Sequence, residues 1–229
     1  MTSKLCVALT FDDGLIEHYS VAQLLNRLGI RATFFVVTHI KNHEGRTLLT
    51  SRPELMERIS KKGHEIGSHT KTHPNLTTIP LYEVEEEARE SKQLLENLIG
   101  TEIRGFAYPY GAYNANVVKI ISKYYKYARG GGVNPLEDPF NVKFENLYTL
   151  GAFARQRRYI RKLLKLPVKL IKRDYISCIR IALVLHAESL PEILMLITYL
   201  KSLPAHTCFM SMSELLNLSS SDYQALSIE

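Results

Sequence analysis

Apolar residues along the chain fall into short runs that alternate between two patterns. Runs rich in Val, Ile, Phe, Tyr and Thr, ending near Gly, Asp, Pro or His, predict strands. They lie near 5–11, 30–38, 64–68, 104–109, 125–129, 147–153, 179–186 and 206–210. Helix-like runs between them lie near 17–28, 53–62, 80–99, 114–123, 156–173 and 189–203. This alternation predicts a parallel sheet with crossover helices.

The number of strands narrows the fold class. Eight short strands favour a closed barrel over an open sheet, and the lack of an evident helix between 130 and 147 makes that barrel irregular. We therefore expect a distorted (β/α) barrel of seven or eight mostly parallel strands. A chain of 229 residues suits one such domain, so residues 1–229 are predicted to form a single domain.

Polar side chains able to carry out chemistry gather where the predicted strands end. In parallel α/β barrels this edge carries the active site. The residues in question are Asp12 and Asp13 after the first strand, His69 and His73 after the third, Pro109 and Tyr110 after the fourth, Arg129 at the fifth and His186 at the seventh.

Two histidines and a carboxylate form a three-ligand metal set that leaves positions open for water and substrate. His69 and His73 are four residues apart, so they can point the same way in a turn or helix. Zn²⁺ is the expected ion, although Co²⁺, Ni²⁺, Mn²⁺ and Fe²⁺ use the same ligands. Successive strand residues point in opposite directions. One of Asp12 and Asp13 can therefore bind the metal while the other accepts a proton from water.

Other interpretations of these residues are less favoured. Adjacent Asp residues before Gly are common in turns. A glycosidase needs its carboxyls roughly 5–9.5 Å apart across a bond, which neighbours on one strand do not provide. A non-haem iron oxygenase uses the same ligand set but needs neither the second Asp nor His186. His39 and His43 also have the i, i+4 spacing, but lacking further context they are predicted to be exposed loop residues.

Four segments together resemble the polysaccharide deacetylase superfamily (NodB homology domain, carbohydrate esterase family 4). They are Thr10-Phe11-Asp12-Asp13-Gly14, Ser68-His69-Thr70-Lys71-Thr72-His73-Pro74, Phe106-Ala107-Tyr108-Pro109-Tyr110-Gly111 and Leu183-Val184-Leu185-His186, here called the first, second, third and fifth motifs. The resemblance runs from Leu5 to His186. It implies a distorted (β/α) barrel and metal-dependent removal of N-acetyl or O-acetyl groups, usually from amino sugars or glycans containing them.

The resemblance also implies a role for each matching residue. Asp12 corresponds to the general base and His186 to the general acid. Asp13, His69 and His73 correspond to the metal ligands. The Tyr110 backbone N–H corresponds to an oxyanion donor, and the implied substrate-binding positions beside it are Pro109, Val184 and Arg129.

The chain also departs from the family pattern. Ala107 stands where an arginine usually braces the base, Ala187 follows His186 where an Asp is frequent, and the fourth motif is not recognisable. Arg129 or Arg155, both at predicted strand ends, is a candidate replacement for that arginine; a surface or substrate role is the alternative. Two other functions therefore stay open: a catalytically impaired sugar-binding or regulatory protein, and an amidohydrolase acting on a small non-sugar amide.

The net charge of +6 comes from one segment. Residues 155–173 contain nine Lys or Arg and no acid, and the rest of the chain is mildly acidic. The segment is either a barrel helix with a solvated face or a face for an anionic membrane, a lipid-phosphate-linked sugar or an acidic polymer. Nucleic acid is not expected, because no nucleic-acid-binding motif accompanies it.

Composition and the start of the chain bear on location. No run approaches the ~20 apolar residues of a membrane span. The first strand begins too early for a signal peptide, so we expect a cytoplasmic protein, with attachment to the inner membrane surface if the basic segment binds lipid. Cys6, Cys178 and Cys208 are odd in number and far apart, which favours free thiols.

Overall fold

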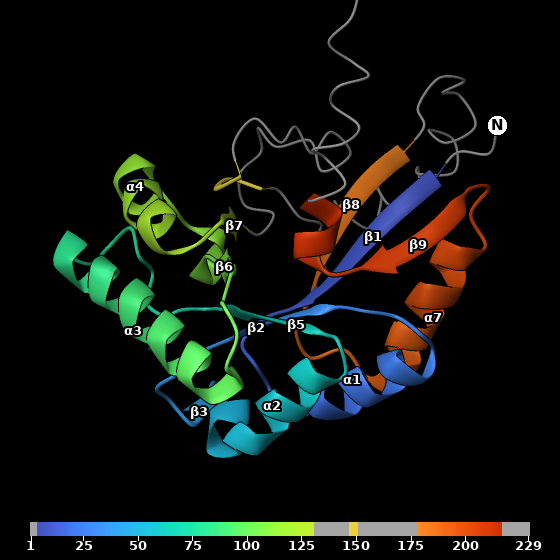
Figure 1. The fold of residues 1–229 in the computed structure, drawn as a ribbon, viewed down its shortest axis with the longest axis horizontal. Helices are drawn as coiled ribbons and strands as arrows, with labels where there is room; N and C mark the ends of the chain where they lie inside the picture. The colour runs from blue at the N-terminus through green and yellow to red at the C-terminus, as the bar shows by residue number, and fades with distance from the viewer. Residues whose placement is uncertain (1–3, 131–146, 151–177, 217–229) are drawn as a thin grey trace, which may run out of the picture.

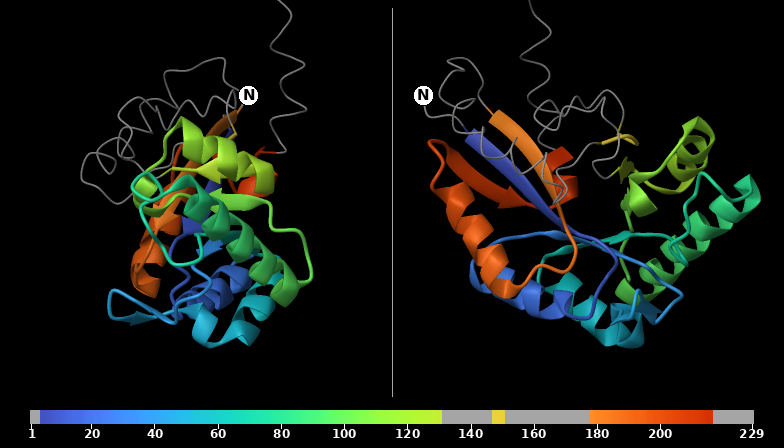
Figure 2. Two further views of the ribbon diagram at one scale, coloured as in Figure 1. Left: turned by 90° about the vertical axis from the view of Figure 1, so that its left-hand side faces the viewer. Right: turned by 180° about the vertical axis from the view of Figure 1, so that it is seen from behind.

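A curved parallel sheet forms the centre of the molecule (Figures 1 and 2). The computed structural model describes residues 4–130, 147–150 and 178–216. The sheet runs in the order β7-β6-β5-β2-β1-β8, and β9 also pairs with β1. Its strands are β1 (Lys4–Phe11), β2 (Thr33–Val36), β5 (Glu65–Ser68), β6 (Gly105–Ala107), β7 (Tyr127–Arg129), β8 (Cys178–Leu185) and β9 (His206–Met210). Seven parallel strands curling into a half-barrel confirm the predicted fold class.

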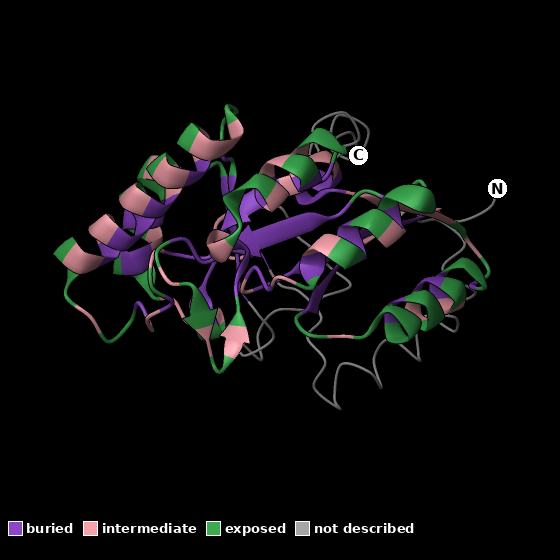
Figure 3. Ribbon diagram, turned by 90° about the horizontal axis from the view of Figure 1, so that it is seen from below, coloured by how far each residue is buried: buried purple, intermediate pink, exposed green. Residues whose placement is uncertain are grey.

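Helices cover the outer face of the sheet and turn their apolar sides toward it (Figure 3). They are α1 (His18–Arg27), α2 (Pro53–Lys61), α3 (Leu81–Ile99), α4 (Ala115–Tyr124) and α7 (Leu190–Lys201). Two single-turn helices, η1 (Leu49–Ser51) and η2 (Pro109–Gly111), lie in the loops. The helix limits agree with the capping signals in the sequence. Gly100 ends α3 in the left-handed conformation, and Ser189 starts α7 with a capping box.

Strand alternation divides the apolar side chains into two cores. Leu5, Val7 and Leu9 of β1 belong to the core beneath the helices. Cys6 and Ala8 belong to a second core inside the curve of the sheet, together with Phe35, Ala107, Tyr127, Ala182, Val184 and others. Because side-chain direction alternates along a strand, Asp12 after β1 and His186 after β8 continue the inward-facing series.

The structure departs from the sequence prediction in three places. β2 is shorter than the predicted strand 30–38. A small hairpin of β3 (Asn42–His43) and β4 (Arg46–Thr47) was not predicted. In the predicted strand 147–153 the described residues show a single bridge, between Leu150 and Arg129. The predicted helix 156–173 lies outside the described residues, so the anionic partner expected for it stays a prediction.

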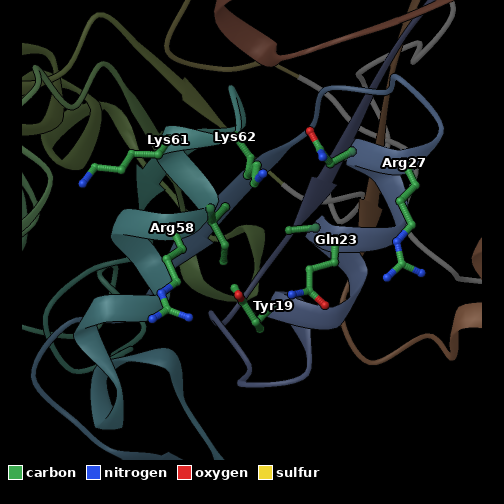
Figure 4. A pocket seen from close by; sticks show the side chains of 9 residues that line it. Tyr19, Gln23, Arg27, Arg58, Lys61 and Lys62 are labelled. Carbon is green, nitrogen blue, oxygen red and sulfur yellow. The ribbon is translucent and has the colours of Figure 1, made fainter.

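A cavity of about 390 Å³ opens in the outer layer, between α1 and α2 (Figure 4). Tyr19 and Gln23 line it from α1, and Arg58 and Lys62 line it from the α2 side. It contains none of the residues that the sequence marks as chemical. Its charged groups belong to the solvated face of amphipathic helices.

The structure bears on two expectations drawn from composition, the state of the cysteines and the absence of a membrane span. Neither Cys6 nor Cys208 forms a disulfide bond among the described residues, and Cys6 is buried. Within the described part of the chain, no helix combines the length and the apolar character that crossing a bilayer requires. The expected cytoplasmic location and the single-domain boundary at 1–229 stay predictions.

Candidate functional site

The turn after β1 separates the two aspartates of the first motif. Asp13 and Gly14 both adopt positive φ, 70° and 69°. A Cβ on Gly14 would lie 2.8 Å from Val36 Cγ1, so this turn requires glycine. Asp12 is 5% exposed and continues the strand, whereas Asp13 is turned toward the second motif. The adjacent carboxylates therefore face different partners, as the sequence predicted.

Asp13, His69 and His73 bring their ligand atoms together. All three atoms lie within 4.8 Å of one another, the one such group found in the described residues. Asp13 Oδ1 is 3.5 Å from His69 Nε2 and 3.5 Å from His73 Nε2, and the two nitrogens are 3.2 Å apart. His69 comes directly after β5, and His73 from the loop that follows.

The hydrogen bonding of His69 shows that this donor set fits a cation. His69 Nδ1 lies 2.8 Å from the Ala107 carbonyl oxygen, so Nδ1 carries a proton and donates it. In the neutral ring Nε2 is then a bare acceptor facing His73 Nε2 and the Asp13 carboxylate. His69 Nε2 and the Asp13 carboxylate are then two acceptors that converge beside His73 Nε2, and a divalent ion held by all three residues would remove the repulsion between them. A carbonyl that fixes the tautomer of a ligand histidine is a common feature of metal sites.

The pKa values of Asp13 and His73 also favour cation binding by this group. Burial raises the pKa of Asp13, but the hydrogen bond and charge of His69 and the other histidines outweigh it, so that pKa lies well below its usual value. Burial, with the charge of His69, lowers the pKa of His73 to about 4. Burial lowers the pKa of His69, but bonding to Asp13 leaves it raised overall. At neutral pH Asp13 is a carboxylate and His73 is neutral, the forms in which both groups can bind a cation.

The loop that carries His73 is held in place by α3. The Glu87 carboxylate accepts hydrogen bonds from the backbone N–H groups of Lys71 and Thr72, at 2.7 and 2.8 Å, and from the Thr72 hydroxyl at 2.5 Å. Thr70 Oγ1 accepts from the His73 N–H at 2.9 Å. Glu87 is only 8% exposed. These bonds stabilise a loop in which Thr70 and His73 both have positive φ.

Asp12 is paired with a buried arginine from another strand. Arg129 Nη2 donates to Asp12 Oδ1, and the Arg129 side chain is 1% exposed. The guanidinium also lies 4.8 Å over the Phe35 ring. Arg129 on β7 is the direct register partner of Ala107 on β6. Arg129 thus brings a guanidinium to Asp12 from the strand next to the one that carries Ala107. Arg155, the other candidate, lies outside the described residues.

His186 lies at the end of β8, beside Asp12. The β1–β8 register pairs Phe11 with Leu185, and the Asp12 N–H donates to the Leu185 carbonyl at 2.9 Å. The His186 side chain is exposed. Its backbone is fixed on both sides: its carbonyl lies 2.5 Å from His18 Nε2, and its N–H donates to Glu188 at 2.6 Å. An exposed imidazole therefore lies on a backbone held by hydrogen bonds at the edge of the site.

The third motif adds Tyr110, whose ring is 4.8 Å from the ring of His73. Tyr110 is 56% exposed and has a φ of 59°. Pro109 before it is buried, and Val184 is buried on β8. Positive φ is uncommon for residues other than glycine and costs about 1–3 kcal/mol. All but one of the described cases lie in these motifs: Asp13, Thr70, His73 and Tyr110. Such strain is typical of functional sites.

Two residues of this region were not foreseen from the sequence. His43 is half-buried, with its ring 4.3 Å from that of His73, so the prediction that it is an exposed loop residue was wrong. The hairpin places it there through a contact between residues 30 positions apart. His39 is exposed, as predicted. Glu87 stands in a glutamate-rich helix and carried no signal of its own.

Comparison with known proteins agrees with this geometry. The sequence profile described as polysaccharide deacetylase matches residues 1–127, more than half of the chain. A chitooligosaccharide deacetylase from Rhizobium leguminosarum bv. trifolii is 34% identical over 116 residues, which are 49% of this chain and 49% of that protein. The chain thus matches about half the length of this relative.

Two solved structures share the fold over almost the whole chain. The Xyl-CE4 domain of a multidomain xylanase from the hindgut metagenome of Trinervitermes trinervoides has a TM-score of 0.62 at 23% identity, covering 95% of this chain and 92% of that one. BA3943, a CE4 family pseudoenzyme from Bacillus anthracis, has a TM-score of 0.62 at 20% identity, covering 94% and 66%. With the profile match over the first three motifs and the fold over the rest, the chain belongs to the polysaccharide deacetylase family.

Proposed function

We propose that this protein is a metal-dependent hydrolase that removes N-acetyl or O-acetyl groups from a substrate containing amino sugars. The observation that carries the proposal is the pairing of a convergent Asp13–His69–His73 group with a separate carboxylate, Asp12, held by Arg129. A protein that only binds sugar has no need for a buried ion pair beside such a group. The relative named for action on chitooligosaccharide supports an acetylated glucosamine oligomer as substrate.

Asp13, His69 and His73 would hold one divalent ion, with Zn²⁺ expected from two nitrogen ligands and one oxygen ligand. When bound, such an ion polarises the acetyl carbonyl and makes water a stronger nucleophile. Asp12 would then accept the proton of the attacking water, and the hydrogen bond from Arg129 orients its carboxylate. Asp12 is the neighbour of Asp13 in the chain, so the proposed base would lie beside a metal that Asp13, His69 and His73 would hold.

On the other side of the substrate, His186 donates a proton to the leaving amine or alkoxide. Its exposed side chain can reach a bound substrate, and its fixed backbone keeps it next to Asp12. The Tyr110 backbone N–H is the proposed donor to the developing oxyanion, and the exposed Tyr110 ring beside His73 offers a surface for a sugar. Pro109 and Val184 support these positions from the interior.

The test is acetate release from an N-acetylglucosamine pentamer by protein treated with chelator and then reloaded with Zn²⁺. Activity should appear only after reloading. Asp13→Ala should lose both metal and activity, whereas Asp12→Asn should retain metal and lose activity. His186→Ala should retain metal, with turnover lower by about 10²–10⁴-fold. Equal metal loss in the two aspartate variants would contradict the roles, and acetate release that persists in chelator would contradict metal dependence.

A further inference from the structure

The β3–β4 hairpin is rigidly joined to the loop of the first motif. Its turn residues Glu44 and Gly45 both have positive φ, 48° and 77°, as in the two-residue turns that match strand twist. The Ile16 N–H donates to the Thr47 carbonyl at 3.0 Å, and the Leu49 N–H donates to the Gly14 carbonyl at 2.7 Å. Leu15 also packs with Leu48 in a small buried cluster. The hairpin therefore keeps a fixed position relative to Asp13.

His43 projects from this hairpin onto the metal-binding group. Its ring centroid is 4.3 Å from that of His73, at an angle of 53°. The side chain is 19% exposed, so part of it packs and part stays accessible. Among the described residues its ring nitrogens make no hydrogen bond, and Glu44 Oε1 lies 4.0 Å from Nε2. A half-buried imidazole with unused hydrogen-bonding capacity thus borders the place where substrate would bind.

We propose that His43 contacts the substrate, with a ring nitrogen forming a hydrogen bond to a hydroxyl group of the bound saccharide. The inference rests on the proposed function, because it places a saccharide beside the metal ligands. Binding sites of this kind use a few well-placed polar groups to orient an otherwise loosely held ligand. His43 and Tyr110 of the third motif both contact His73, so together they would form one wall of the substrate site, and His43 is the part of that wall from outside the family motifs.

A purely structural role for His43, as packing for His73, predicts a different outcome. Removing the packing would loosen a metal ligand and reduce metal content. Removing a substrate contact would leave the metal in place and weaken saccharide binding. His43→Ala, His43→Asn and the control His39→Ala separate the two. His39 precedes the hairpin, four residues away, and its side chain is exposed.

The expected result is that His43→Ala retains one metal per chain, with KM raised roughly 3- to 10-fold for the N-acetylglucosamine pentamer and kcat little changed. His43→Asn, which still donates and accepts, should recover part of the loss, and His39→Ala should match the unaltered protein. Metal loss in His43→Ala, or an unchanged KM, would overturn the proposal.

Calorimetric binding of the same pentamer to metal-loaded protein distinguishes failure of the proposed His43 contact from failure of the proposed function. If the unaltered protein binds the pentamer without releasing acetate, catalysis is refuted, and a 3- to 10-fold weaker binding by His43→Ala would still support the contact. If it binds no pentamer at all, both ideas fail together.

Discussion

Replacing Arg129 with methionine should destabilise the protein by roughly 3–5 kcal/mol, the usual cost of removing one partner of a buried ion pair. Arg129 is 0% exposed and Asp12 is 5% exposed, so water cannot take over the lost contact. At an effective dielectric constant of about 20, two unit charges about 4 Å apart attract by roughly 4 kcal/mol, which agrees with that range. Methionine fills much of the space, so the loss reports the uncompensated Asp12 charge.

The assay is urea unfolding followed by circular dichroism, in chelator so that metal binding does not contribute. Asp12→Asn alone leaves the buried guanidinium unpaired and should also be destabilising. The double variant, which removes both charges, should lose less stability than Arg129→Met alone. Arg31→Met is the control, because Arg31 pairs with Glu214 at the surface and should change stability by no more than about 1 kcal/mol. Additive losses in the double variant would refute the pairing.

The strand register allows a rescue of activity. Ala107 and Arg129 are opposite each other on β6 and β7. In an Arg129→Ala background that has lost activity, Ala107→Arg should restore part of it by supplying the guanidinium from the family's usual position. If Arg129→Ala retains full turnover, Arg129 has no part in holding the base.

Further predictions concern the supports of the site. Glu87→Gln should lower metal affinity about 10- to 100-fold, as changes to groups behind metal ligands do, because it weakens the hydrogen bonds that hold the His73 loop. Competition with a chelator measures this affinity. Glu83→Gln, a change in the first turn of the same helix, should have no effect. Burial lowers the pKa of His18 to about 4, so the unfolded chain binds one more proton than the folded chain between pH 4 and 6.5. Stability should therefore decrease as the pH is lowered from 6.5 to 4, by roughly 3 kcal/mol in total from this residue. His18→Gln should show a shallower decrease, and equal slopes for the two proteins would contradict the prediction.

The sequence by itself determined the sheet and the meeting of the residues that form the candidate metal site. Alternating strands and helices require parallel strands, and parallel strands bring their carboxyl ends to one edge. Asp13 and the second-motif histidines each follow such a strand, so their meeting follows from topology. The separate directions of Asp12 and Asp13 follow from strand alternation and from the glycine turn. The spacing of these residues along the chain was therefore sufficient to predict that they meet in one site.

Only the tertiary structure decided which distant residues complete the site. Arg129 was one of two candidates, and it was the register of β6 against β7 that placed it opposite Ala107, within reach of Asp12. Glu87 looks like any acid in a helix with many glutamates until packing buries it under the His73 loop. His43 lies on a strand of two residues, too short for any periodic signal. Each of these contacts joins segments far apart in the chain, and their geometry depends on how the sheet curves and its loops pack.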